Sequence, residues 1–142
     1  MLILLIFLPL FGFISGIFFG RFLNTCFVTT SLMFICFFIS LFLAYDLFFF
    51  GTQYIINLGT WFSSDTLLIS WSFLFDNLTI IMLCVVTLIS SLVHLYSIEY
   101  MENDPHQPRF MSYLSLFTFF MLILVTGNNF LQMFVGWEGV GL

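Results

Sequence analysis

The chain has 142 residues, of which 62% are hydrophobic and only 6% carry a charge. Soluble domains carry about 25% charged residues, so this composition excludes a soluble globular protein. Arg21 and Arg109 are the only basic residues apart from two histidines, and lysine is absent. A nucleic-acid-binding function is therefore excluded as well, because it requires a basic surface patch. The length suits one membrane domain over residues 1–142.

Charges and turn-forming residues divide the first part of the chain into apolar segments of about 20 residues, the length that crosses a bilayer. We predict transmembrane helices at about 2–20, 22–45, 78–97 and 110–126. The first contains Pro9, which would kink it, and it lacks the basic start of a cleavable signal peptide. The polar segment 98–109 is predicted to be a loop.

Two further elements are less regular. A break at residues 127–129 precedes a fifth apolar stretch, 129–142, which is predicted to be the first half of a fifth transmembrane helix. Between the second and third helices, apolar residues alternate with a period of two over 69–75, which indicates a β-strand. Residues 54–56 are its candidate partner, with turns at 57–64. We predict a short surface hairpin or extended segment over about 52–75, with an irregular loop as the alternative.

The predicted fold class is therefore an all-α polytopic membrane protein with four complete helices, half of a fifth, and a hairpin between the second and third. Arg21 follows the first helix and Arg109 precedes the fourth. In a zigzag of helices both arginines lie on one side of the membrane, the side where insertion begins. The N-terminus, the hairpin and the break are expected on the opposite side.

Glu138 is the candidate functional residue. It lies nine residues into the fifth helix, about 13 Å along its axis, whereas half of the hydrocarbon core is about 15 Å. An ionisable group at that depth marks an ion or proton path by default. Burial disfavours a charged carboxylate and a nearby cation favours it, so a moving cation would make this carboxyl bind and release a proton. Gly136, Gly139 and Gly141 would let another helix approach. The alternative is a neutral glutamate that only locks helix packing.

The sequence provides no cation for Glu138, because both arginines belong to loops at the membrane surface. The fifth helix also stops about 6 Å beyond Glu138, short of the far membrane surface. We therefore expect a second chain to continue the helix and to carry the cation, unless this chain is a fragment.

Other polar residues are weaker candidates. Asp76 is predicted to cap the third helix. His94 is predicted to be a hydrogen-bonded residue near the membrane surface, with proton uptake as the alternative. Asp104 and His106 have no third partner that would complete a metal site. No metal or redox cofactor is therefore expected in this chain, which lacks a dinucleotide fingerprint and the cysteine spacing of an iron–sulfur site.

Two long stretches resemble a known family. Residues 71–101, WSFLFDNLTIIMLCVVTLISSLVHLYSIEYM, and residues 104–142, which end in GNNFLQMFVGWEGVGL, are similar to the N-terminal part of chain 5 of NADH:ubiquinone oxidoreductase. That chain is the distal antiporter-like subunit of respiratory complex I. The opening, MLILLIFLPLFGFISGIFFGRFL, resembles the start of the same family, whereas residues 24–66 are too variable to help.

The resemblance implies an antiporter-like fold, proton translocation, and a multi-pass location in the mitochondrial inner membrane. Glu138 in GWEGVGL matches the family's essential glutamate, which pairs with a lysine on a later helix. The family uses NADH, FMN, iron–sulfur clusters and ubiquinone, all bound in other subunits. The expected partners are a second chain with the remainder of a split subunit, other membrane-arm subunits, and lipids.

Two other functions remain open from the sequence. A subunit of a multi-subunit sodium/proton antiporter shares the same motif and needs no quinone. A purely structural piece of the membrane arm would use Glu138 only for packing.

Overall fold

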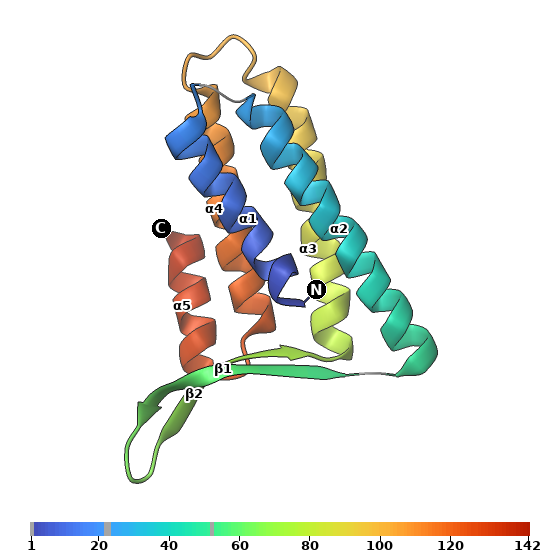
Figure 1. Ribbon diagram of the computed structural model, residues 1–142, viewed down its shortest axis with the longest axis vertical. Coiled ribbons are helices and arrows are strands. Elements are labelled where there is room, and N and C mark those ends of the chain that lie inside the picture. Colours follow the sequence, from blue (N-terminus) through green and yellow to red (C-terminus); the bar gives the residue numbers. More distant parts are fainter. Residues whose placement is uncertain (1, 22–23, 52) are drawn as a thin grey trace.

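The computed structural model describes residues 2–21, 24–51 and 53–142. Four long helices stand side by side, a short fifth helix lies outside the fourth, and a two-stranded hairpin extends across one end of the bundle (Figure 1). In chain order the elements are α1 (Leu2–Phe19), α2 (Thr25–Phe50), β1 (Tyr54–Ser63), β2 (Leu68–Phe75), α3 (Asn77–Tyr100), α4 (Gln107–Thr126) and α5 (Phe130–Gly141). The predicted fold class is confirmed.

Among the described residues, α1 to α4 are long and apolar enough to cross a membrane. Only 33–39% of each span is buried within the chain. The remaining surface carries large exposed apolar side chains, such as Phe38 in α2 and Ile89 in α3. In water such a surface would be unfavourable, so these faces contact lipid or other protein in the membrane.

The ends of three long helices differ from the predicted ends. The second helix does not stop before Asp46 but continues to Phe50, where Gly51 takes a left-handed conformation with φ 64° and donates its N–H to the Leu47 carbonyl. Glycine adopts this conformation without steric cost and so ends the helix. Likewise α3 extends through Glu99, and α4 starts at Gln107. Charged residues do not break a helix at the membrane surface, because their side chains reach water.

Residues 22 and 52, the predicted starts of the second helix and of the hairpin, lie outside the described residues.

The hairpin lies within the predicted span, but its first strand is longer than the predicted 54–56 and its turn lies later. β1 and β2 pair antiparallel from Tyr54 opposite Phe75 to Ser63 opposite Leu68. The turn is therefore at residues 64–67 instead of 57–64. Gly59 has a φ of 150° beside an irregularity in the pairing, and only glycine takes this conformation readily. Trp61 and Trp71 stack across the strands with ring centroids 4.7 Å apart.

The interior of the bundle combines an apolar cluster with a seam of small polar residues between α1 and α4. Leu5, Phe75 and Leu122 are fully buried members of the apolar cluster. In α1, Gly12 and Gly16 lie directly against Ser115 and Ser112 of α4. Small residues let membrane helices approach closely. The Ser112 hydroxyl donates to the Pro108 carbonyl of its own helix, and the Ser115 hydroxyl is 3.3 Å from Nε2 of His94. The contact between these glycines and serines holds α1 against α4 and so fixes the helix on which α5 packs.

Both arginine-bearing segments lie at the end of the bundle opposite the hairpin (Figure 1). Arg21 lies two residues after the end of α1, and Arg109 lies in the first turn of α4. The N-terminal end of α1, the hairpin and the Gly127–Asn129 break lie toward the other end. The zigzag arrangement used to predict orientation is therefore present.

Candidate functional site

The helix that carries Glu138 begins at a well-defined cap. Asn129 has extended backbone angles, and its side-chain oxygen accepts the N–H of Gln132 at 2.8 Å. Asparagine is among the best residues at this position because its oxygen satisfies an otherwise unpaired helix N–H. The amide nitrogen of Asn129 donates to the Ser70 carbonyl at 2.6 Å. The start of α5 is therefore attached to β2 of the hairpin.

Two further hydrogen bonds strengthen this attachment. Ser72 in β2 donates its backbone N–H to the buried side-chain oxygen of Gln132 at 3.1 Å. Asn128 donates to the Ser72 hydroxyl at 2.9 Å. Phe73 and Gly127 form a β-bridge in the same place. The hairpin thus fixes both the position and the direction of α5.

Glycines fix the side of α5 that faces α4. Gly136 is buried, and a Cβ added there would lie 2.6 Å from the backbone nitrogen of Leu124. A Cβ at Gly139 would collide with the ring of Phe120. Of the three glycines predicted to allow a close helix contact, Gly136 and Gly139 are confirmed. Gly141 has open space around it within this chain, so the contact expected of that residue stays a prediction.

Glu138 points away from this contact. It lies two residues after Gly136 and one before Gly139, so at 100° per residue its side chain falls on the outward face of α5. The side chain is exposed, as are Leu131, Phe134 and Trp137 beside it on that side of the helix. Within the described residues, no basic group lies within 4.0 Å of its carboxylate.

The depth of Glu138 follows from the helices beside it. It is eight residues from Phe130, about 12 Å along α5. Gly136 and Gly139 face Leu124 and Phe120 of the antiparallel α4. Glu138 lies between the two glycines, so it is level with a point on α4 about 8 Å from the end of that helix at Thr126. The carboxyl is therefore inside the apolar length of the bundle, on the hairpin side of its middle.

His94 forms a second polar centre, separate from Glu138. Its Nδ1 is 2.7 Å from the Ser90 carbonyl and its Nε2 is 3.3 Å from the Ser115 hydroxyl. The side chain is only 1% exposed. The hydrogen-bonded role predicted for it is present. The ring lies between α3 and α4, six residues before the end of α3 at Tyr100, and its distance from the membrane surface stays a prediction. The partners fit a neutral ring that donates from Nδ1 and accepts at Nε2.

The other sequence candidates occupy simple structural positions. Asp76 caps α3, as predicted, and accepts the N–H of Thr79 at 2.9 Å. Asp104 accepts the backbone N–H of His106 at 2.8 Å within its loop. No group of three potential metal-ligating side chains occurs in the part of the chain that the structure describes.

The polar contacts between helices were not predicted from the sequence. Ser40 and Thr87 hydroxyls are 3.0 Å apart between α2 and α3, and Thr118 donates to Ser90 at 3.3 Å between α4 and α3. The available signal was the spacing of Ser112, Ser115 and Thr118, which places three small polar residues on one face of a helix. Gln132 was missed as well, because only the fold shows that it is buried against the hairpin.

Comparison with known proteins points to one family. The family model described as NADH-Ubiquinone oxidoreductase (complex I), chain 5 N-terminus, matches residues 61–111. The proteins named NADH-ubiquinone oxidoreductase chain 5 from Triticum aestivum and Arabidopsis thaliana are each 54% identical over 145 residues, which covers 100% of this chain and 22% of theirs. The protein of the same name from Cryptococcus neoformans is 59% identical over 92 residues, covering 65% of this chain and 14% of its own length. The chain thus spans about 22% of the length of the relatives it matches throughout.

Proposed function

We propose that this chain, which belongs to the family of NADH-ubiquinone oxidoreductase chain 5, forms the acidic half of a proton-translocating site in the membrane arm of that enzyme. Family membership is supported over the whole chain by the 54% identity of two relatives. The role of the site is our inference from the position of one carboxyl.

The exposed carboxyl of Glu138 is the observation that carries the proposal. α5 packs against α4 through Gly136 and Gly139, and Asn129 caps its start. Its outward face is apolar except for Glu138. Leaving a carboxyl unpaired in lipid costs at least a few kcal/mol, so this arrangement requires a partner. We propose a lysine, carried by a second chain or a later segment with the remainder of the subunit.

The mechanism follows from that pairing. When the lysine is close, Glu138 is ionised and paired. When the lysine withdraws, the carboxylate is left in an apolar setting and takes up a proton, which it releases when the lysine returns. The glycines and the hairpin keep α5 fixed during this cycle, so the lysine is the moving member.

The energy for that movement is proposed to come from NADH oxidation by ubiquinone in other subunits. An iron–sulfur cluster requires four protein ligands, usually cysteines, and this chain has only Cys26, Cys36 and Cys84. None of these belongs to a group of ligand side chains in the described residues. We propose that NADH, FMN, iron–sulfur and quinone chemistry takes place in the other subunits, and that the whole assembly lies in the mitochondrial inner membrane.

The test replaces Glu138 by Gln in the assembled complex. The amide keeps the size and hydrogen-bonding capacity of the side chain but cannot exchange a proton. We expect fewer protons translocated per NADH oxidised in proteoliposomes, with the amount of assembled complex unchanged. The matched control is Glu102→Gln, which makes the same chemical change in an exposed loop.

Three outcomes would contradict the proposal. Unchanged proton stoichiometry in Glu138→Gln would exclude the proton-path role. Loss of assembly with normal pumping by the remaining complex would favour the structural alternative. Sodium-dependent proton exchange without NADH oxidation would favour the sodium/proton antiporter.

A further inference from the structure

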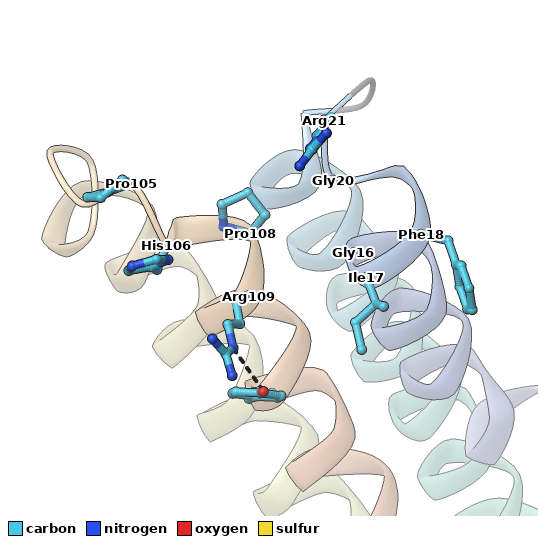
Figure 2. A pocket seen from close by; sticks show the side chains of 10 residues that line it. Gly16, Ile17, Phe18, Gly20, Arg21, Pro105, His106, Pro108 and Arg109 are labelled. Carbon is cyan, nitrogen blue, oxygen red and sulfur yellow. Dashed lines mark hydrogen bonds between the residues drawn. The ribbon is translucent and has the colours of Figure 1, made fainter.

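The largest concentration of positive charge lies at the end of the bundle remote from the hairpin. There a cavity of about 680 Å³ opens between the last turns of α1 and the first turns of α4. Arg21 and Arg109 both line it, together with His106 (Figure 2). The chain has no other arginine and no lysine. A protein with a net charge of −5 thus places both of its permanent cations around one cavity.

Neither arginine forms an ion pair with an acidic residue in the part of the chain that the structure describes. Ten described residues line the cavity, and none of these is acidic. The nearest acid in sequence to His106, Asp104, uses a carboxylate oxygen to accept the His106 backbone N–H. The N-terminus of α4 also begins here, and His106 provides it with no side-chain cap in the described chain. The positive end of the helix dipole therefore adds to the two guanidinium groups.

The guanidinium group of Arg109 is held in place before any ligand binds. Its Nε donates to the Tyr113 hydroxyl at 3.0 Å, and its central carbon lies 5.6 Å from the centre of the Tyr113 ring. Figure 2 shows the Arg109 side chain beside α4, with this hydrogen bond as a dashed line. Its two Nη groups make no hydrogen bond to the described residues. A guanidinium group with free Nη groups matches the geometry of phosphate oxygens.

The walls of the cavity are apolar toward the middle of the membrane. Ile17 of α1 lines the cavity and is 50% exposed, and the neighbouring Phe18 is 73% exposed. Gly16 of α1 and Gly20 directly after that helix also line the cavity, and they lie directly against Ser112 and Pro108 of α4, so the two helices are in contact beside it. Charged groups at the membrane surface above an exposed apolar helix suit a molecule with an anionic head and hydrocarbon chains.

We propose that this cavity binds the phosphate headgroup of an anionic membrane lipid. The phosphate lies between Arg21 and Arg109, and an acyl chain runs along α1 over Ile17. This site does not depend on the role of Glu138, since the two lie at different ends of the bundle and share no residue.

The experiment uses the intact complex reconstituted in nanodiscs of phosphatidylcholine. A small amount of phosphatidylglycerol with a photoreactive diazirine in its acyl chain is added, and cross-linked peptides are identified by mass spectrometry. Phosphatidylcholine with the same diazirine is the comparison. We expect phosphatidylglycerol to label the segment around Ile17 preferentially. Equal labelling by the two lipids would overturn the proposal without any variant.

Variants then test the two arginines. Each basic residue near an anionic lipid strengthens binding by a factor of about five. Arg21→Gln and Arg109→Gln should therefore each reduce the preference for phosphatidylglycerol over phosphatidylcholine in the labelling about fivefold, and the double variant should reduce it about 25-fold. The double Lys variant keeps both charges and should retain most of the preference. An excess of inorganic phosphate should not displace the lipid. Displacement would show that the cavity binds free phosphate instead.

Discussion

Asp76 is a single residue whose contribution to stability can be isolated. Its carboxylate accepts the Thr79 N–H, and this hydrogen bond holds the pKa of Asp76 below its usual value. We expect Asp76→Ala to destabilise the start of α3 by about 1 kcal/mol. Amide exchange around Thr79 in the assembled complex should accelerate about fivefold, and unchanged exchange would contradict the role of the cap.

The same cap predicts a pH dependence. The pKa of Asp76 is lower in the folded chain than in the unfolded chain, where it is about 3.9. Its stabilisation is therefore complete above that value and is lost as the pH falls through the folded pKa. Asp76→Asn retains a capping oxygen without an ionisable group. Protection of the Thr79 amide should then no longer change with acidification, whereas in the original chain it should fall.

At the scale of elements, the contact between α4 and α5 decides where Glu138 points. Gly136→Ala places a methyl group 2.6 Å from the Leu124 nitrogen, so one of the two helices must move. Such overpacking costs about 1–3 kcal/mol. We expect a lower melting temperature of the purified complex and reduced proton pumping.

Gly141→Ala provides the matched control, because it adds the same methyl group to the same helix where nothing lies within 4 Å. It should leave both measurements unchanged. Equal effects of the two variants would show that helix propensity, and not the contact with α4, is responsible.

The elements themselves were predictable to different degrees. Apolar length and turn residues located every helix, and the period of two in residues 69–75 located β2. The end of α2 was not predictable from charge, because Asp46 lies within the helix and the left-handed Gly51 ends it. Most of β1 was missed, since residues 57–63 lack the apolar alternation and pair with β2 through their backbone.

For the whole molecule, the sequence identified the carboxyl but not its surroundings. Glu138 was apparent because a charge among apolar residues is rare in a membrane segment. Its outward direction could be derived only once Gly136 was seen against α4. The cavity between Arg21 and Arg109 joins residues 88 positions apart, and only the packing of α1 on α4 brings them together.

The attachment of the hairpin to the bundle can be tested at the same scale. Gln132→Leu removes the buried acceptor of the Ser72 N–H, and an unpaired buried donor costs about 1–3 kcal/mol. We expect faster amide exchange at Ser72 and easier proteolysis of the turn at residues 64–67. Gln53→Leu makes the same change at an exposed position and should have neither effect.

This attachment also sets an order of events during synthesis. Hydrogen bonds join Ser70 and Ser72 to residues that lie 56 to 60 positions later in the chain. At about 5–20 residues per second, the ribosome needs about 3–12 seconds to make that length, whereas a hairpin forms in microseconds. The hairpin therefore lies at the membrane surface without these hydrogen bonds while α3 and α4 are made and inserted. The hydrogen bonds form only after Gln132 leaves the ribosome, so a translation pause before that residue leaves the hairpin without its side-chain attachments.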